Sequence, residues 1–329
     1  MSTASIPETE FAIAGSAMFT YPTRLADSWT AAILQIAVPS FKMKRPAVPV
    51  TLTNGLAATL RASDPRAHVL LKSFMRGLPP IEDRDSYLLD ARHDTDGNIA
   101  HILANVVSPY LALREMFPGL KVVLRRNATS MAQHVYRLLD IPIMCTDRSV
   151  AGKVVSVLAP SPEGFRGLGL YADYFAQIDF KNYVSDTPEK VFISRKGTRA
   201  LLNEDEVENV LVSRGFKKFY FEDIPINLQW SIGRNAKVVV GVHGAALSSI
   251  TFNRSEIKLI ELFHPGYIVR MYRFIANIVG GTWCGVTGEY PPDIIRRLDY
   301  EKMGRYFALK PTRISIDSLK MALDHAGVD

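Results

Sequence analysis

The feature of this sequence that most constrains its fold is the alternation of strand-like and helix-like segments in its second half. Short segments rich in β-branched and aromatic residues alternate with longer amphipathic segments, and the connections between them are short. The expected strands are residues 190–196, 216–224, 237–241 and 257–263, and the expected helices are residues 203–215 and 227–236. Such alternation is typical of a parallel, Rossmann-like sheet. The sequence therefore predicts an α/β fold.

The helix expected at residues 203–215 carries a signal at each end. Asn203 is predicted to be its N-cap, and Glu206 is predicted to complete a capping box three residues later. Gly215 is predicted to end the helix, because glycine readily adopts the left-handed conformation that follows a helix.

The first half of the chain also predicts α/β structure. Residues 97–119 have the pattern of a long helix, with a kink at Pro109 and a stop at Pro118 and Gly119. Strands are expected at residues 120–125 and 141–146, with a helix between them at residues 130–140 that is capped by Ser130. The residues before 85 show only a mixed pattern.

Length and composition predict two domains. The 329 residues are enough for two domains of roughly 150 residues, each with its own core. Residues 157–169 are rich in proline and glycine and are the best candidate for a linker. We therefore place the domains at residues 1–160 and 161–329. The second domain is expected to end in a strand and then a helix capped near Asp317.

Charge and cysteine usage limit the partners and the compartment. The formal net charge is +6, but the basic residues are scattered and form no nucleic-acid-binding motif, so nucleic acid is not an expected partner. No apolar stretch reaches the roughly 18 residues of a membrane span. The first residues lack the pattern of a secretory signal, and Cys145 and Cys284 are too far apart for metal-ligand spacing. We therefore expect a cytoplasmic protein with reduced thiols.

Glycines and cations gather where two of the expected strands end. Gly241 and Gly244 flank His243 at the end of the strand at residues 237–241. Open parallel sheets bind ligands at the carboxyl ends of their strands, where helix N-termini attract anions. If the two strands are neighbours, the glycines and cations at their ends form a pyrophosphate site. Otherwise the glycines form an ordinary turn, and the cations lie at a solvated strand end. The cations at the end of the first expected strand are Arg195, Lys196 and Arg199.

These segments also carry a resemblance to a known family. The stretches FISRKGTRALLNEDEVENVLVSRGF, VVVGVHGAALSSITF and IELF are similar, in this order, to the C-terminal core of glycosyltransferase family 61. The stretch NIAHILANVV resembles the family's N-x-x-H-W-L helix and aligns His101 with its histidine. Ala246 stands where the family usually has glycine, and Ser249 where asparagine is common. Both departures bear on the identity of the donor.

The resemblance implies an inverting enzyme of the GT-B fold, in which two Rossmann-like domains face a cleft. It implies that residues 161–329 bind a nucleotide-diphosphate-sugar, with a UDP-sugar as the expected donor. Residues 1–160 would bind the acceptor, a glycan or a lipid-linked saccharide. The implied enzyme is a hexosyl- or pentosyltransferase of capsular or other surface polysaccharide synthesis, cytoplasmic or peripheral at the inner face of the membrane.

The resemblance also assigns donor-binding residues one by one. Asn203 and Glu204 fall on motif positions as well, but a helix cap and a first-turn carboxylate explain them. Glu261 is expected to bind a ribose hydroxyl or to be a solvated strand end. The resemblance places Arg195, Arg199, His243, Gly244 and Ala245 on motif positions. Together with the argument from the strand ends, the expected donor-binding residues are Arg195, Lys196, Arg199, Gly241, His243, Gly244, Ala245, Ala246 and Glu261.

Inverting transfer needs a base that takes the proton of the acceptor hydroxyl, and we expect it in the first domain. His101 is the first candidate, on the same helix face as Asn105, although a lone helical histidine is often a core residue. Asp94 and Asp96 are the second candidates. The base is therefore predicted to lie between residues 94 and 101.

Two D-x-D tripeptides, at residues 83–85 and 94–96, match the pattern of metal-dependent glycosyltransferases. We expect no obligatory metal or cofactor, because arginine and helix amides replace the cation in a GT-B site. Two other functions stay open. A Rossmann epimerase or dehydrogenase is disfavoured because no G-x-G-x-x-G opens a first βα turn. A non-catalytic nucleotide-binding module would keep the phosphate site without a base.

Overall fold

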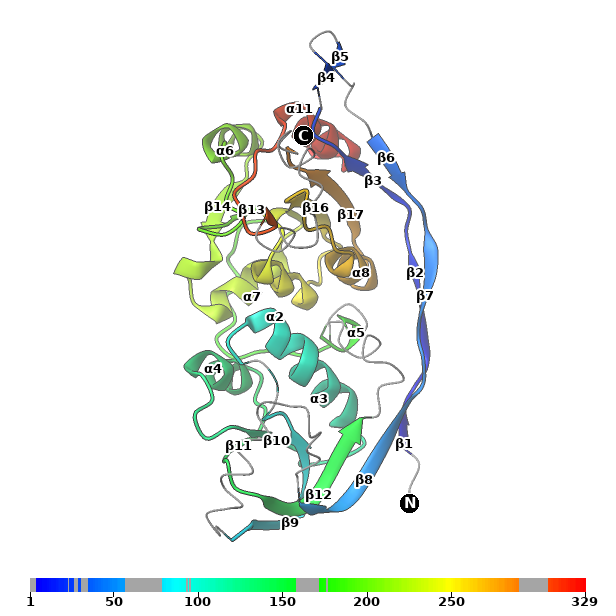
Figure 1. Cartoon of the computed structure of the whole chain (residues 1–329), viewed down its shortest axis with the longest axis vertical. Coiled ribbons are helices and arrows are strands. Elements are labelled where there is room, and N and C mark those ends of the chain that lie inside the picture. The colour runs from blue at the N-terminus through cyan, green and yellow to red at the C-terminus, as the bar shows by residue number, and fades with distance from the viewer. Residues whose placement is uncertain are drawn as a thin grey trace. The chain divides into compact units, whose positions relative to one another are not determined.

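The chain forms two compact units, which are traced in Figure 1. A computed structural model describes residues 4–22, 24–26, 29–30, 35–56, 79–92, 94, 96–157, 172–175, 177–289 and 307–329. Unit 1 comprises Met1–Glu10 and Lys44–Asn182, and unit 2 comprises Phe11–Met43 and Tyr183–Asp329. The expected linker lies outside the described residues from residue 158 onward. A boundary at residue 160 and the roles of the two domains therefore stay predictions.

Unit 2 is built on a seven-stranded sheet with the order β14-β13-β15-β16-β17-β3-β6. Its strands are β13 (Lys190–Ser194), β14 (Lys217–Tyr220), β15 (Val238–Val242), β16 (Lys258–Phe263), β17 (Thr282–Thr287), β3 (Ser16–Phe19) and β6 (Gln35–Val38). All are parallel except β6, which pairs antiparallel with β3. The predicted parallel α/β sheet is thus confirmed for this part of the chain.

The order of these strands creates a switch point between β13 and β15. The chain goes from β13 to β14 on one side, and then crosses to β15, β16 and β17 on the other side. Ile193 of β13 pairs with Gly241 of β15, so the two strands end side by side. Ligands of doubly wound sheets bind outside the carboxyl ends at such a point.

Helices cover both faces of this sheet, and all five residues of β15 are buried as a result. Figure 1 shows α6 and α11 on one face and α7 and α8 on the other. A 3-10 helix, η4, follows β15 and packs against α7 and α8. The helical elements are α6 (Glu204–Val212), η3 (Phe221–Asp223), α7 (Ile226–Asn235), η4 (Ala245–Phe252), α8 (Met271–Ile278) and α11 (Ile316–His325).

Asn203 precedes α6 as predicted, but its side chain does not cap the helix. Its Nδ2 donates to the carbonyl oxygen of Ile314 at 2.9 Å, and the Ile314 amide donates to its Oδ1 at 3.0 Å. The capping box is therefore wrong, because the buried side chain ties the start of α6 to the segment before α11 instead. Gly215 follows the helix with a φ of 81°, which confirms the predicted stop.

Other predicted ends shift by a few residues. The strand expected at 216–224 ends at Tyr220 and gives way to η3. Ser315, not Asp317, caps α11 by accepting from the Ser318 amide at 3.3 Å. The strand expected before α11 is reduced to a single bridge between Thr312 and Leu201.

The N-terminal residues, whose pattern was mixed, contribute strands to both units. β3 pairs in parallel with β17, and Met18 is the register partner of Gly285. Two further pairs are β2 (Thr9–Ile13) with β7 (Phe41–Arg45), and β4 (Arg24–Ala26) with β5 (Trp29–Thr30). The division at residue 160 groups Phe11–Met43 with the first domain, whereas the contacts group it with unit 2.

Unit 1 contains a six-stranded sheet with the order β1-β8-β12-β9-β10-β11. Its strands are β1 (Ala4–Ile6), β8 (Val48–Leu56), β9 (Ile81–Asp90), β10 (Lys121–Leu124), β11 (Ile143–Cys145) and β12 (Val150–Val157). The last four are parallel, β8 pairs antiparallel with β12, and β1 pairs antiparallel with β8. The strand order reverses beside β9, so the switch point of unit 1 lies between β9 and β12.

The long helix predicted at 97–119 is three consecutive segments. They are α2 (Ile99–Ile102), the π-helix η1 (Leu103–Val107) and α3 (Ser108–Leu113). Pro109 lies just after the π turn, where a wider turn accommodates the missing N–H and the ring. Ser108 Oγ donates to the Leu103 carbonyl oxygen at 2.8 Å within this turn.

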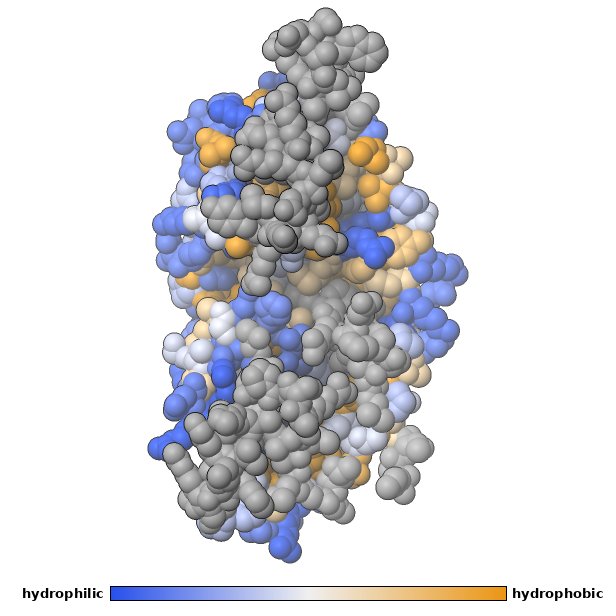
Figure 2. Space-filling model, viewed as in Figure 1, coloured by the Kyte–Doolittle hydropathy of each residue, from blue (hydrophilic) through white to orange (hydrophobic). Residues whose placement is uncertain are grey.

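The other helices of unit 1 are α4 (Ser130–Leu138) and α5 (Ala172–Phe175). Thr129, not Ser130, caps α4, because its hydroxyl accepts from the Ala132 amide at 3.2 Å. None of the helices in the described ranges is long and apolar enough to cross a membrane. Figure 2 shows apolar residues in separate patches among hydrophilic ones on the described part of the face drawn.

Candidate active site

Two arginines follow β13 at the switch point of unit 2. Arg195 crosses to the neighbouring strand end, where its Nη1 donates to the His243 carbonyl oxygen at 3.2 Å. Its Nη2 donates to Thr198 Oγ1 at 3.1 Å, within the same turn. Arg199 has a φ of 61°, a left-handed conformation that a non-glycine residue rarely adopts. The turn thus holds both side chains at the carboxyl ends of β13 and β15.

Gly244 leaves the space that Arg195 occupies. A Cβ atom at this position would lie 2.0 Å from Arg195 Nη1, closer than any non-bonded contact allows. The backbone of Gly244 is extended, with a φ of 167°, so the close approach and not the conformation requires glycine. This fit explains why a glycine stands between His243 and the start of η4.

The two guanidinium groups lie close enough to affect each other and have no acidic partner in the part of the chain that the structure describes. Burial, together with the positive charge of Arg195, lowers the pKa of Arg199. Among the described residues, no carboxylate forms an ion pair with either arginine, and each has a buried Nε without an acceptor. Arg199 instead lies 4.9 Å from the ring centroid of Tyr267. Two unneutralised cations side by side form a site for an anion.

His243 is held between a carboxylate and three aromatic rings. Its Nδ1 lies 2.5 Å from Glu261 Oε1, and the other oxygen of Glu261 accepts from Trp283 Nε1 at 2.7 Å. The imidazole stacks on Phe263 with centroids 5.4 Å apart. It also contacts Tyr267 at 5.3 Å and Tyr272 at 5.4 Å, centroid to centroid. These contacts fix the orientation of the ring.

Glu261 differs from its expected role. Its side chain is fully buried, and both of its oxygens are used by His243 and Trp283. This burial speaks against direct contact with a ribose hydroxyl and excludes a solvated strand end. The expectation of a solvated strand end is therefore wrong, and the contact with a ribose hydroxyl stays a prediction.

Two further residues complete this side of the site. Tyr272 Oη donates to the Gly244 carbonyl oxygen at 2.6 Å, and burial raises its pKa, so it stays protonated as a donor. His264 is 2% exposed, and burial together with Arg199 lowers its pKa to about 4. Its Nδ1 accepts from the Gly266 amide at 3.0 Å, which requires the neutral imidazole.

The remaining expected residues of unit 2 divide into two groups. Ala245 and Ala246 begin η4, so their amides belong to its first turn, and Gly241 lies in β15 beside Ile193. Lys196 is exposed and forms an ion pair with Asp223 at 2.5 Å. The structure thus brings Arg195, Arg199, His243 and Gly244 together and directs Lys196 elsewhere.

In unit 1, the candidate bases follow β9 at its carboxyl end. His101 is exposed in α2, and its amide donates to the N-cap, Asn98, at 3.4 Å. No hydrogen bond of its ring occurs among the described residues. Asp94 is half-buried, and its amide donates to the Ala91 carbonyl oxygen at 3.0 Å. The expectation of a core histidine is thus not met, and the imidazole is accessible.

Asp96 is already fully engaged. Its oxygens accept from Arg125 at 2.5 Å and from the Thr129 amide at 3.0 Å. Burial alone would raise the pKa of Asp96, but these donors hold it below the usual range. A carboxylate held in this way is a weak proton acceptor, although the assignment of the base itself stays a prediction.

The sequence of this site also matches a family. The model of the glycosyltransferase 61 family matches residues 78–260, which is more than half of the 329 residues. The chain belongs to glycosyltransferase family 61. It is therefore a glycosyltransferase, with a sugar donor and an acceptor as substrates. No curated protein matches the chain.

The matched range of this glycosyltransferase contains both strand ends that meet at the switch point. It ends one residue before Glu261. Four residues that contact the predicted ones were not expected from the sequence: Thr198, Tyr267, Tyr272 and Trp283. The only signal in the sequence was the density of aromatic residues after β16.

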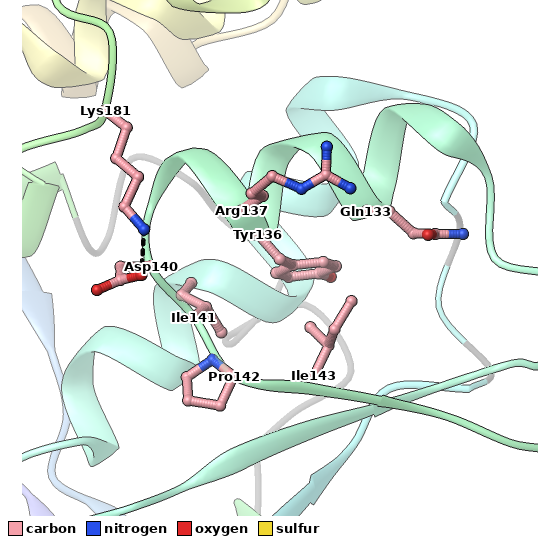
Figure 3. A pocket seen from close by; sticks show the side chains of 8 residues that line it. All are labelled: Gln133, Tyr136, Arg137, Asp140, Ile141, Pro142, Ile143 and Lys181. Carbon is pink, nitrogen blue, oxygen red and sulfur yellow. Dashed lines mark hydrogen bonds and ion pairs between the residues drawn. The ribbon is translucent and has the colours of Figure 1, made fainter.

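The glycosyltransferase also has a surface hollow of about 400 Å³ at the end of α4 (Figure 3). Pro142 and Ile143 lead into β11, so the hollow lies at the amino end of that strand. His101 follows a carboxyl end, at the opposite edge of the same parallel sheet. Lys181 already pairs with Asp140 inside the hollow. The lining residues are Gln133, Tyr136, Arg137, Asp140, Ile141, Pro142, Ile143 and Lys181.

Proposed function

We propose that the protein is an inverting glycosyltransferase that uses a nucleotide-diphosphate-sugar donor, with a UDP-sugar as the expected one. It transfers a hexosyl or pentosyl group to a glycan or a lipid-linked saccharide. The acceptor hydroxyl oxygen attacks the anomeric carbon while a base takes its proton. The bond from that carbon to the diphosphate breaks, and the diphosphate leaves with the electron pair.

The observation that carries this proposal is a pair of arginines that form no ion pair with a carboxylate among the described residues. Arg195 and Arg199 lie beside each other at the switch point, each with a buried Nε that lacks an acceptor. Such an arrangement is costly unless an anion binds there, because like charges repel and buried donors lose their water. A departing diphosphate supplies the negative charge and the acceptor oxygens.

The backbone around His243 supports the same interpretation. Gly244 has no side chain, and the amides of Ala245 and Ala246 open the first turn of η4. The first amides of a helix have no partner within it and attract anions. We infer that these amides and the His243 ring bind the diphosphate together with the two guanidinium groups.

The positive groups replace a metal ion in this proposal. Asp83, in the first D-x-D tripeptide, already pairs with Lys121 at 3.0 Å. A hydrogen bond from Ser86, together with this ion pair, lowers the pKa of Asp83. Asp96, in the second tripeptide, is engaged by Arg125 and Thr129. Cations and amides thus occupy these carboxylates, which favours a mechanism without an obligatory metal.

The base belongs to the acceptor side in this proposal. His101 is our first candidate because it is exposed, follows the switch-point strand β9 and has a ring that makes no hydrogen bond among the described residues. We further propose a GT-B arrangement in which the two sheets face a cleft. A cytoplasmic role in surface polysaccharide synthesis, at or near the inner face of the membrane, completes the proposal.

The test is a thermal-shift screen with UDP-, GDP-, CDP- and CMP-sugars, followed by an assay of donor hydrolysis. A ligand that binds only the folded state raises the melting temperature, so the true donor is expected to give the largest rise. Hydrolysis of that donor separates an enzyme from a non-catalytic binding module. If no nucleotide-sugar stabilises the protein or is hydrolysed, the proposal is wrong. Activity that is lost in EDTA and restored by Mn²⁺ would overturn the metal-free mechanism.

A further inference from the structure

The fully buried Glu261 lies in the interior of β16, between two strands that carry glycine at the matching positions. Gly241 of β15 and Gly285 of β17 are its register partners. A Cβ atom at Gly285 would lie 3.1 Å from the Trp283 ring, so the missing side chain gives the indole room to pass over it. The sheet thus leaves space at Gly285 for the indole that reaches Glu261, whereas Leu247 fills the space at Gly241.

Those groups are His243 from the end of β15 and Trp283 from β17. The indole nitrogen of Trp283 can only donate, so it occupies Oε2 of Glu261 at 2.7 Å whatever the state of the histidine. The other oxygen faces His243 Nδ1 at 2.5 Å. The Glu261 carboxylate, which belongs to β16, therefore links the end of β15 to β17.

This contact decides which nitrogen of His243 can meet a ligand. The two nitrogens lie on different sides of the imidazole, so a ring with Nδ1 on Glu261 directs Nε2 away from it. A carboxylate only accepts hydrogen bonds, so the contact with Glu261 places a hydrogen on Nδ1. Among the described residues, the other charged groups near this ring are Arg195 and Arg199.

We propose that Glu261 is a positioning residue, which acts on the donor diphosphate through His243 without touching the donor. It holds Nδ1, so that Nε2 is the atom presented to a phosphate oxygen. Trp283 holds the carboxylate in this position. This inference rests on the proposed diphosphate site. It adds the residue that orients His243, one of the hydrogen-bond donors of that site.

The experiment is a double-mutant cycle measured by calorimetry on the full chain, with inorganic pyrophosphate and UDP as probes. The four proteins are the wild type, Glu261→Gln, His243→Asn and the double variant. Each single variant is expected to weaken the binding of both probes about tenfold, as expected for a charge-assisted hydrogen bond. The double variant is expected to bind no more weakly than His243→Asn, because Glu261 then has no ring to orient.

Each alternative outcome overturns a distinct statement. Additive losses in the cycle would mean that Glu261 acts independently of His243, which overturns the positioning role. A loss for UDP but not for pyrophosphate would mean that Glu261 serves the nucleoside, which also overturns it. If the wild type binds neither probe, the proposed diphosphate site is wrong, and this inference is wrong with it.

A control separates the effect from general loss of stability. Cys284 is buried beside Trp283 in β17 and belongs to the core of the sheet. Cys284→Ala is expected to lower the melting temperature and to leave both affinities within a factor of two. If this variant loses affinity as much as Glu261→Gln does, the effect is structural and the proposal fails.

A second variant carries the test if Glu261→Gln does not fold. Trp283→Phe keeps an aromatic ring in place but removes the donor to Oε2. It is expected to weaken pyrophosphate binding about threefold, and this effect is expected to vanish in a His243→Asn background. An affinity equal to that of the wild type would overturn the role of Trp283 and Glu261 in orienting the histidine.

Discussion

Each of the two sheets reverses its strand order beside one strand, at β13 in unit 2 and at β9 in unit 1, yet the residues that follow these strands differ in kind. After β13, Arg195 and Arg199 lie together with no carboxylate partner among the described residues. After β9, the acid Asp96 is paired with Arg125, and the exposed group is His101. The end of β13 thus carries positive charge that no described carboxylate neutralises. The segment after β9 carries a neutralised carboxylate and an accessible imidazole.

In the proposed mechanism, the two strand ends serve the two halves of one reaction. A departing diphosphate needs fixed positive charge that no acid has already neutralised. An acceptor hydroxyl needs a group that takes a proton, and a carboxylate held by Arg125 and Thr129 is poorly suited to that task. In both cases the topology places side chains at the carboxyl end of a strand. The pairing of their charges decides which chemistry those side chains can perform.

The largest expected effect tests the unit 1 side of the comparison. His101→Ala is expected to lower turnover by about 10² to 10⁴, with donor affinity unchanged, because a general base acts on the acceptor proton. Steady-state kinetics and calorimetry measure the two quantities. His134→Ala, a change on another helix of unit 1, is the control. Near wild-type turnover of folded His101→Ala would remove this residue from the mechanism, and turnover abolished only in Asp94→Asn would assign the base to Asp94.

The second prediction uses the pH dependence of stability to test the positive charge at the end of β13. The pKa of His264 lies at about 4 in the folded protein and near 6.5 in the unfolded chain, so the unfolded chain binds the extra proton between these values. The contribution of His264 to the free energy of unfolding is complete above pH 6.5. It is lost as the pH falls towards 4, by about 3 kcal/mol in total. Unfolding of wild type and His264→Asn by urea across this range measures the effect.

His264→Asn is expected to flatten that pH dependence, because the asparagine oxygen accepts the Gly266 amide without titrating. Arg199→Gln is expected to reduce it in part, because Arg199 is the second cause of the low pKa, after burial. A pH dependence identical in all three proteins would show that His264 does not report the charge of this edge.

The third prediction compares the two arginines with their neighbour. Arg195→Ala and Arg199→Ala are each expected to weaken UDP binding by roughly 1 to 3 kcal/mol, the range for a charged hydrogen-bond partner. Lys196→Ala is the matched control, since this cation is exposed and paired with Asp223. Calorimetry that finds equal affinities for all of these variants, with every nucleotide diphosphate that binds, would contradict the diphosphate site.

The smallest expected effect concerns the packing of Gly244 against Arg195. In Gly244→Ala the new methyl group would displace Nη1 of Arg195, but the end of a long side chain can move aside. We expect UDP affinity to fall by about tenfold or less and the melting temperature to change little. An Arg195→Ala background is expected to remove the effect. An equal loss in both backgrounds would show that the glycine serves the backbone and not the arginine.

The sequence predicted the local structure around the unit 2 site well. The predicted strands at residues 190–196, 237–241 and 257–263 correspond to β13, β15 and β16, because buried parallel strands have a continuous apolar pattern. Glycines and cations at their ends were visible in the same way. The contact between Arg195 and His243 depended on β13 and β15 being neighbours, which the sequence raised only as a condition.

The errors share one cause. Asn203 has the sequence signature of a cap, but it bonds to Ile314, 111 residues away. Ser130 has the same signature, but Thr129 is the cap, and its amide and hydroxyl bond to Asp96. Polar side chains near a helix start can serve either the helix or a distant segment, and local sequence does not distinguish these uses.

By itself, the sequence determined the family, the α/β class and the chemistry of two strand ends, because strand and helix patterns and glycine turns are local properties. The tertiary structure decided how residues far apart in the chain are paired. It placed β3 beside β17, buried Glu261 between His243 and Trp283, and gave Arg195 and Arg199 no acidic partner among the described residues. These features depend on which strands become neighbours and which charges meet, and burial makes those meetings decisive because a low dielectric strengthens every charge that remains unpaired.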